Sequence, residues 1–401
     1  MCKSPRLRMF LDLGETPLAN SFLTKEALEK PEAKFPLRVF FCEDCNLSQL
    51  VDVVSPEVLF RDYIYFSSGV PHVPEHFRKY AEEVVENFVG SKNDLVVEIG
   101  SNDGVLLSVI KKMGARTLGV DPARNIAVVA NERGIETIPE FFGENLAQQI
   151  VQQYGLAKVV IGNNVVAHID NHHDLVNGVN TLLARDSVFI FEAPYLLDMF
   201  DNLAFDTIYH EHLSYLSISP LRKFFTRYGM EIFDVKTVPV QGNSLRVYVG
   251  KKGEHVITPH VGEFLKDESS RKFDDYSAYL SLADEVYNLK KQVVGFLKEA
   301  KNAGKRIAAY GAPAKGNTLL NFFGMGRDLI EYATEELPPK VGLFTPGTHI
   351  PVVDIKWARE NPPDYFLLLA WNYKEAILQK EQKLRNQGVK FVMPIGKVEV
   401  V

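Results

Sequence analysis

The pattern of apolar and polar positions changes at about residue 91. From there on, short apolar runs alternate with segments whose apolar residues recur every three or four positions. Buried strands give the first pattern and amphipathic helices give the second. Strands that alternate with helices predict a mostly parallel, doubly wound sheet. The strands expected in this sheet are 95–99, 116–120, 134–138, 158–161, 187–191, 229–235 and 244–249.

The segments that flank this unit have different patterns. Residues 1–80 contain brief apolar runs typical of short strands and turns, and they lead into an amphipathic helix expected over 74–90. Residues 263–303 are charged, with apolar positions three to four apart, which predicts a packing helix or helix pair. A second α/β unit follows, with strands expected at 306–310, 364–371 and 390–394.

The expected fold class is therefore α/β, with a central Rossmann-like sheet, a small N-terminal module and a second α/β domain. A chain of 401 residues is long enough for two or three domains with cores of their own. The expected boundaries are 1–75 for the N-terminal module, 76–260 for the central domain, 261–300 for a helical connector and 301–401 for the C-terminal domain.

Composition narrows the classes of partner. The net charge of -6 argues against a general binder of nucleic acid or of anionic membranes, because such proteins are normally basic. No stretch approaches 18 consecutive apolar residues, and the first residues lack the apolar core of a signal peptide. A cytoplasmic protein with no membrane or nucleic-acid partner is expected.

The cysteines indicate a metal site. All three, Cys2, Cys42 and Cys45, lie in the first 45 residues, and an odd number does not form a disulfide framework. Cys42-Glu-Asp-Cys45 has the CxxC spacing of half a structural zinc site, although a free or redox-active pair is an alternative. A complete site needs four ligands, and neither His72 nor His76 has ligand spacing. A fourth cysteine three residues before Cys2 would fall ahead of Met1, as it would if the start were truncated.

The turn Glu98-Ile-Gly-Ser-Asn-Asp-Gly104 follows a buried strand and opens a helix. Its glycines allow a ligand to approach the backbone, and Asp121, near the end of the next strand, suits a ribose diol. Carboxylates here would repel a pyrophosphate, so a ribose-bearing cofactor with a cationic tail, S-adenosylmethionine, fits better than NAD. The alternative is a purely structural turn. The cofactor-binding residues expected from this turn and the next strand end are Glu98, Gly100, Ser101, Asn102, Gly104, Asp121 and Pro122.

Polar residues also follow the expected strand at 158–161. Asn163, Asn164 and His168 would lie at the carboxyl edge of the sheet, where ligands bind in such folds. We expect Asn163 and Asn164 to join the cofactor site. The alternative is that the asparagines are turn residues and His168 caps a helix.

The segment Tyr209-His-Glu-His212 concentrates titratable side chains between apolar runs. Histidine has a pKa near neutrality, and a neighbouring glutamate can orient or tune it, so general acid/base work is the main interpretation. HExxH spacing is absent, which disfavours a metal. Structural hydrogen bonding is the third interpretation. In an extended segment the two histidines would face one side, whereas in a turn all four side chains could converge.

A second strand-turn-helix junction, Gly311-Ala-Pro-Ala-Lys315-Gly-Asn317, carries a lysine and no nearby carboxylate. Backbone N–H groups and an ammonium suit phosphate. The Pro/Gly loop at 345–351, with Thr348 and His349, is a candidate wall of the same cleft. We expect Lys315, Asn317, Thr348 and His349 to bind substrate, the alternative for each segment being a surface loop. Two crevices imply a cofactor in one domain and a nucleotide-bearing substrate in the other.

Taken together, these motifs resemble the sugar C-methyltransferases of deoxysugar biosynthesis, over essentially the whole chain. The segments that carry the resemblance are Leu13–Phe22, Phe41–Leu50, Tyr63–Ser68, the Glu98 turn, Asn163–Asp170, Tyr209–His212, Ala314–Asn321 and Pro346–Pro351. The resemblance implies a zinc module, a central S-adenosylmethionine domain and a C-terminal domain that enclose a nucleotide-linked 4-keto-deoxysugar. It also implies that Cys2, Cys42 and Cys45 match three of four zinc ligands, and that His212 is the catalytic base with Tyr209, Glu211, His168 and Tyr63 beside it.

The chemistry of such a transfer is coherent. A histidine can remove a C–H proton beside a ketone, expected here at position 3 of the sugar, if the enolate oxygen is stabilised. We expect Tyr209 or His168 to donate to the 4-keto oxygen and Glu211 to orient the His212 ring. The alternatives are a methyltransferase for RNA, protein or another small molecule, an NAD-dependent nucleotide-sugar enzyme, and an inactive homologue.

Overall fold

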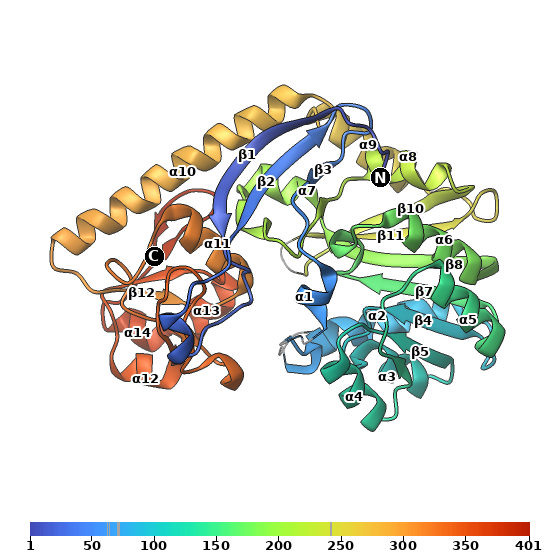
Figure 1. Ribbon diagram of the computed structural model, residues 1–401, viewed down its shortest axis with the longest axis horizontal. Coiled ribbons are helices and arrows are strands. Elements are labelled where there is room, and N and C mark those ends of the chain that lie inside the picture. The colour runs from blue at the N-terminus through green and yellow to red at the C-terminus, as the bar shows by residue number, and fades with distance from the viewer. Residues whose placement is uncertain (62, 64, 70–72, 241–242) are drawn as a thin grey trace.

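The computed structural model describes residues 1–61, 63, 65–69, 73–240 and 243–401. Its strands form three sheets, of four, seven and six strands. Figure 1 shows the seven-stranded sheet and its helices on one side of the molecule and the C-terminal unit on the other, with the long helix α10 spanning between them. The α/β fold class expected from the sequence is confirmed.

The N-terminal sheet has the order β1-β2-β3-β9. Strand β1 is ten residues long, so the expectation of only short strands before residue 80 was wrong; β1 and β2 pair along their length as one antiparallel ribbon. The fourth strand comes from far along the chain and pairs with β3 through Ser48 and Tyr215. The segment that follows His212 is thereby fixed against the N-terminal module. The strands are β1 (Leu7–Thr16), β2 (Phe35–Cys42), β3 (Ser48–Leu50) and β9 (Ser214–Tyr215).

The central sheet has the order β10-β11-β8-β7-β4-β5-β6. Strands β8, β7, β4, β5 and β6 are parallel neighbours, and β10 and β11 close the sheet as an antiparallel pair. This is the predicted doubly wound core with its two closing strands. The strands are β4 (Leu95–Ile99), β5 (Arg116–Val120), β6 (Thr137–Ile138), β7 (Ala157–Asn163), β8 (Leu183–Pro194), β10 (Met230–Val238) and β11 (Ser244–Lys251).

Helices cover this sheet and the segment before it. The expected helix over 74–90 is observed as α2, whose apolar stripe packs on α3 and the sheet. The helices are α1 (Pro56–Phe60), α2 (Val73–Phe88), α3 (Val105–Lys112), α4 (Arg124–Glu132), α5 (Glu144–Tyr154), α6 (His172–Leu182), α7 (Leu196–Asn202) and α8 (Ile218–Thr226).

The edge strand β6 is shorter than the apolar run 134–138 suggested. Gly134 has a positive φ of 79° and ends the preceding helix, so the chain reaches strand geometry only at Thr137. Only two residues then pair with β5. Sequence periodicity located the strand, and helix termination fixed its length.

The charged segment 263–303 is a helix pair, one of the two forms expected. It consists of α9 (Pro259–Ser270) and α10 (Tyr276–Asn302). The side chain of Asp275 accepts the backbone N–H of Ser277 and caps α10, whose buried stripe runs from Tyr279 to Ala300.

The C-terminal sheet has the order β14-β13-β12-β15-β16-β17, parallel except for β17. Its strands are β12 (Ile307–Tyr310), β13 (Ala333–Glu335), β14 (Val352–Asp354), β15 (Tyr365–Leu368), β16 (Lys390–Met393) and β17 (Glu399–Val400). Its helices are α11 (Ala314–Phe323), α12 (Ile355–Glu360), α13 (Lys374–Lys380) and α14 (Gln382–Asn386).

One continuous cluster of buried apolar side chains joins the three sheets. It includes Phe41 of the N-terminal sheet, Phe189 of the central sheet and Leu367 of the C-terminal sheet. Burying one such side chain stabilises the fold by roughly 1.5–3 kcal/mol. The three units therefore pack together as one body with a shared core.

Candidate active site

A cavity of about 800 Å³ lies where the three units meet. The N-terminal module contributes Phe60 and Tyr63, the central sheet contributes its carboxyl edge, and the C-terminal unit contributes Lys315 and Tyr373. The volume suits two ligands of nucleotide size lying side by side.

The acidic turn lines one wall of this cavity. Gly100 has a φ of 67°, and a Cβ on it would stand 2.2 Å from the Val165 side chain, so only glycine fits there. Gly104 also has a positive φ, but it lies at the start of α3 against Ile135 and is not among the described residues that line the cavity. The other expected cofactor residues all line it: Glu98, Gly100, Ser101, Asn102, Asp121, Pro122, Asn163 and Asn164.

Asp121 organises this wall. One of its carboxylate oxygens accepts the N–H of Asn102 at 2.8 Å, and the other accepts the N–H of Ala123 at 2.9 Å. Burial raises the pKa of the Asp121 carboxyl, and these two donors oppose that rise. Each oxygen keeps a second lone pair, so the carboxylate can shape the turn and still accept a hydrogen bond from a ligand.

Several buried polar atoms on this wall have no hydrogen-bond partner within the part of the chain that the structure describes. They are Glu98 Oε2, Ser101 Oγ, both amide atoms of Asn163 and Asn164 Oδ1. Buried polar groups are normally paired, so such a group of atoms indicates a ligand surface. Burial raises the pKa of Glu98 well above its ordinary value, and a cation beside it would offset the cost of its charge. These residues fit a ligand with hydroxyls and a positive charge, as S-adenosylmethionine has.

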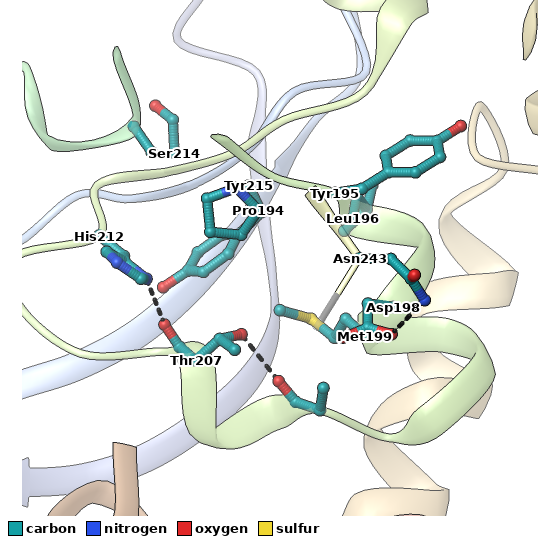
Figure 2. Close-up of a pocket in the computed structure, with 12 residues that line it drawn as sticks. Pro194, Tyr195, Leu196, Asp198, Met199, Thr207, His212, Ser214, Tyr215 and Asn243 are labelled. Carbon is teal, nitrogen blue, oxygen red and sulfur yellow. Dashed lines mark hydrogen bonds between the residues drawn. The ribbon is translucent and has the colours of Figure 1, made fainter. Parts of the chain in front are cut away.

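His212 lines the same cavity. It lies in a tight turn, in which the backbone N–H of His212 donates to the carbonyl of Tyr209 at 2.8 Å. Its Nδ1 is 2.8 Å from the carbonyl oxygen of Thr207, and its Nε2 is 2.8 Å from the hydroxyl of Tyr209. Figure 2 shows the contact with Thr207, beside a small cavity of about 20 Å³ that His212 also lines. A carbonyl can only accept, so Nδ1 carries the proton and Nε2 accepts from Tyr209.

Burial keeps this imidazole neutral. It lowers the pKa of His212 to about 4, and it lowers the pKa of His168 well below its ordinary value. The two rings are 4.9 Å apart, and His168 stacks on Phe60 at 5.7 Å. At neutral pH, His212 therefore has a free-base Nε2 that faces a hydroxyl donor.

The other members of the Tyr-His-Glu-His segment have separate partners. The carboxylate of Glu211 accepts from Tyr63 at 2.8 Å and from Asn20 at 2.6 Å, whereas His210 reaches the carbonyl of Phe35. The expectation that Glu211 orients the His212 ring was wrong, because the carbonyl of Thr207 does so. Glu211 instead holds Tyr63, and Asn20 is a contributor that the sequence patterns missed.

The basic wall of the cavity lies at the turn from β12 to α11. The ammonium of Lys315 is 2.7 Å from Asn372 Oδ1 and lies over the ring of Trp371 at 4.1 Å. Lys340 lines the same part of the cavity and donates to the carbonyl of Ala312 at 3.0 Å. Burial lowers the pKa of both ammonium groups. Lys340 was missed because it follows two prolines in a segment without any motif.

The remaining expected substrate residues lie elsewhere. Asn317 is buried and donates to the carbonyl of Ala19 at 2.8 Å, His349 contacts Glu32 at 3.2 Å, and Thr348 bonds to Thr345 at 2.7 Å. None of Asn317, Thr348 and His349 is among the described lining residues. In this structure Asn317 and His349 attach the C-terminal unit to the N-terminal segment.

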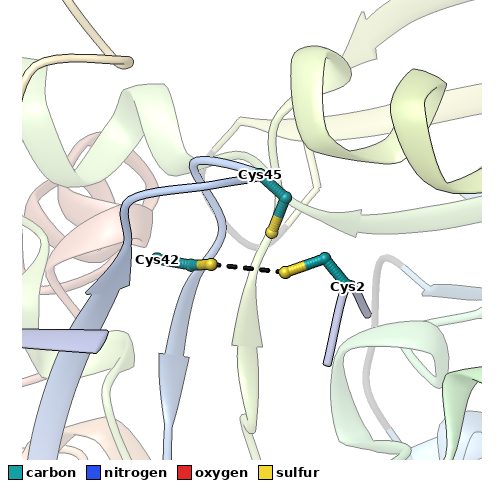
Figure 3. Close-up of side chains that lie close together, drawn as sticks. All are labelled: Cys2, Cys42 and Cys45. Atoms are coloured by element: carbon teal, nitrogen blue, oxygen red, sulfur yellow. Dashed lines mark hydrogen bonds between the residues drawn. The ribbon is translucent and has the colours of Figure 1, made fainter. Parts of the chain in front are cut away.

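The three cysteines converge, as Figure 3 shows. Their Sγ atoms all lie within 4.8 Å of one another, and those of Cys2 and Cys42 are 3.4 Å apart. Thiolates at this spacing fit three corners of a tetrahedral zinc site and suggest a zinc module. His76 lies elsewhere, 2.9 Å from Glu192, and His72 falls outside the described residues.

Family profiles match almost the whole chain. They are described as "Putative zinc binding domain" over residues 1–60, "Methyltransferase domain" over 74–235 and "C-methyltransferase C-terminal domain" over 239–396. C-methyltransferase NovU from Streptomyces niveus is 38% identical over 392 residues, which cover 98% of this chain and 93% of the relative. The chain belongs to the C-methyltransferase family. It is a SAM-dependent methyltransferase, as the sequence motifs predicted.

Solved structures match part of the chain. Magnesium protoporphyrin IX methyltransferase from Synechocystis PCC 6803 with bound SAM is 16% identical, with a TM-score of 0.34, covering 47% of this chain and 86% of that one. A S-adenosylmethionine-dependent methyltransferase from Clostridium acetobutylicum ATCC 824 is 15% identical, with a TM-score of 0.35, covering 46% and 94%. Among the described residues, no helix combines the length and apolar character needed to span a membrane.

Proposed function

We propose that this C-methyltransferase methylates the carbon beside the ketone, at C3, of a nucleotide-linked 4-keto-deoxysugar, with His212 as the base. The observation that carries the proposal is a neutral His212, whose Nδ1–H is held by the Thr207 carbonyl and whose Nε2 is unprotonated, on a cavity with one acidic wall and one basic wall. Each wall suits a ligand of opposite charge, and the base is accessible from the space between them.

The acidic wall would hold S-adenosylmethionine. Asp121 would accept from the ribose hydroxyls, Glu98 would lie near the positive charge, and Asn163 and Asn164 would supply the amide contacts that they lack in the protein. When bound, S-adenosylmethionine supplies an electrophilic methyl group on its sulfonium. Gly100 allows the acidic turn of this wall because its φ is positive and because a Cβ there would stand 2.2 Å from the Val165 side chain.

The basic wall would hold the sugar nucleotide. Lys315 is in the first turn of α11, and Lys340 reaches the carbonyl of Ala312 just before that helix, so the two ammonium groups together suit a diphosphate. The Lys340 ammonium is 3.6 Å from the Glu335 carboxylate, which also lines the cavity, so an anion would share Lys340 with that carboxylate. Both ammonium groups are buried, and an anion beside them is attracted more strongly than it would be at an exposed surface.

His212 would remove the proton beside the ketone. The C–H bond breaks, its proton passes to Nε2, and its electron pair moves into the enolate, whose carbon is the nucleophile to be methylated. Tyr209 now donates to Nε2, so its hydroxyl must turn to the keto oxygen before the base can act. That turn frees the lone pair and stabilises the enolate oxygen, with His168 as a second candidate donor. Glu211 fixes Tyr63 at the edge of this site.

Cys2, Cys42 and Cys45 would hold zinc in a structural role. The ion would tie the chain before β1 to the turn that links β2 and β3. That sheet also carries β9, which directly follows His212 and Leu213, so the module supports the catalytic turn from one side.

The experiment is mass spectrometry of the purified protein with S-adenosylmethionine and a panel of nucleotide-linked 4-keto sugars. A gain of one methyl group, with deuterium from solvent appearing beside the ketone, is the expected result. Methylation of RNA or protein instead, or reduction of a sugar in the presence of a nicotinamide cofactor, would overturn the proposal. A thermal shift with S-adenosylhomocysteine but none with NAD is expected in parallel.

A further inference from the structure

The carboxylate of Asp206 is a buried acidic group that the proposed chemistry does not use. Asp206 lies in the 3₁₀ turn Phe205–Thr207 and is fully buried. Its Oδ2 accepts the indole N–H of Trp371 at 2.7 Å, and its Oδ1 has no partner within the part of the chain that the structure describes. Burying a carboxylate is costly, so a hydrogen bond between a buried carboxylate and another domain points to a role beyond filling space.

The turn that contains Asp206 is the support of the base. The next residue, Thr207, provides the carbonyl that holds the Nδ1–H of His212 at 2.8 Å. The hydroxyl of Thr207 also closes the turn by donating to the carbonyl of Ala204 at 2.7 Å, as Figure 2 shows. A shift of this turn would therefore move or rotate the imidazole.

The C-terminal unit fixes both sides of this turn. Phe205 packs against Phe322 and Phe323 of α11, with ring centroids 5.5 Å apart in each pair, and Asp206 is held by Trp371, which follows β15. The same indole lies under the ammonium of Lys315, the proposed phosphate ligand. Burial raises the pKa of Asp206 to about 6, and the Lys315 ammonium opposes that rise.

We propose that Asp206 is a positioning residue, through which Trp371 and the C-terminal unit set the place of His212. The inference rests on the proposed role of His212 as the base. The lysine that would bind the substrate phosphate and the carbonyl that orients the base are then held by one indole, so the substrate-binding wall and the catalytic turn move as one unit.

The test is Trp371→Phe, which removes the indole N–H and reduces the fused ring system to a single aromatic ring near Lys315. The expected result is a fall in kcat, and in the rate of deuterium wash-in beside the ketone, on the order of tenfold to a hundredfold, since small misplacements of a catalytic group have effects of that size. The affinity for S-adenosylhomocysteine and the melting temperature should stay close to the parent values. Trp357→Phe is the matched control, because the chain has two tryptophans and Trp357 is 45% exposed on α12, outside the cavity lining.

A second pair of variants separates positioning from folding. Asp206→Ala should lower the rate of deuterium wash-in as Trp371→Phe does. Asp206→Asn keeps an acceptor for the indole N–H, so its wash-in rate should be close to that of the parent protein. Unchanged kcat and wash-in in Trp371→Phe would overturn the inference. If His212→Ala is inactive at the same time, the proposed function stands and only the role of Asp206 fails; if His212→Ala retains wash-in, the proposed function itself fails.

Discussion

The junction from β4 to α3 and the junction from β12 to α11 have the same backbone design and opposite chemistry. Each follows a buried parallel strand, turns through a glycine of positive φ that lines the same cavity (Gly100 at 67° and Gly311 at 86°) and leads into a helix. The first presents Glu98 and Asp121, and the second presents Lys315 with Lys340 behind it.

The comparison shows that the glycine turn gives a ligand access to the backbone, whereas the charge of the nearby side chains determines which ligand is favoured. A turn that leads from a strand into a helix exposes backbone N–H groups, which alone favour anions. Buried carboxylates at the first junction reverse that preference toward a cation, whereas buried ammonium groups at the second reinforce it. Under the proposed function, a methyl donor with a positive charge and a substrate with a diphosphate would then bind side by side, with His212 lining the same cavity.

The largest expected effect comes from removing the base between the two walls. His212→Ala should lower the rate of methyl transfer by about 10²- to 10⁴-fold, the range that general bases contribute, while S-adenosylhomocysteine binding survives. Steady-state kinetics and calorimetry measure the two quantities. His260→Asn is the matched control, because this exposed histidine lies on α9, outside the cavity lining. Near-normal turnover in His212→Ala would exclude this histidine as the base.

The acidic wall can be tested alone. Asp121→Ala removes a charged acceptor and the organiser of the turn, so the affinity for S-adenosylhomocysteine should fall roughly tenfold to a hundredfold. The KM for the sugar nucleotide should change little. Glu132→Ala, an exposed acidic residue on α4, is the control for lost negative charge. If calorimetry finds the same affinity for S-adenosylhomocysteine in Asp121→Ala, Asp121 does not bind the ribose.

The basic wall should respond in the opposite manner. Lys315→Gln and Lys340→Gln should each raise the KM for the sugar nucleotide about tenfold, because each loses one charge-assisted contact to phosphate, and leave cofactor affinity unchanged. Lys356→Gln is the control, since this lysine is exposed on α12. Loss of cofactor affinity without a change in sugar-nucleotide KM would reverse the assignment of the two walls.

The smallest expected effect is a shift of the acidic limb in the pH profile of kcat/KM. Burial lowers the pKa of His212 to about 4, so its free base predominates above that pH, and kcat/KM should decline with acid near pH 4. The folded state binds fewer protons than the unfolded state between the ordinary histidine pKa of about 6.5 and pH 4, so the free energy of unfolding should decrease as the pH falls through that window. An activity limb centred near pH 6.5 would contradict the burial of this base.

Prediction from sequence succeeded where the signal is local. The apolar runs located β4, β5, β7 and β8, and the two glycine turns and the CxxC knuckle were found from spacing. It failed where a contact depends on a backbone atom or on a distant segment. Glu211 was assigned to the His212 ring because it is adjacent in sequence, yet in the tight turn it faces Tyr63 and Asn20.

The sequence by itself determined which chemical groups are available, because each lies within a few consecutive residues: a histidine-rich polar segment, an acidic turn, a turn with a lysine and a cysteine knuckle. Only the tertiary structure decided how they act together. It orients His212 through a backbone carbonyl, which no side-chain pattern encodes, and it brings Lys340 to Lys315 and Trp371 to Asp206 from segments far apart in the chain. Long-range packing of three sheets around one cavity fixes those neighbours, and that packing is a property of the whole chain.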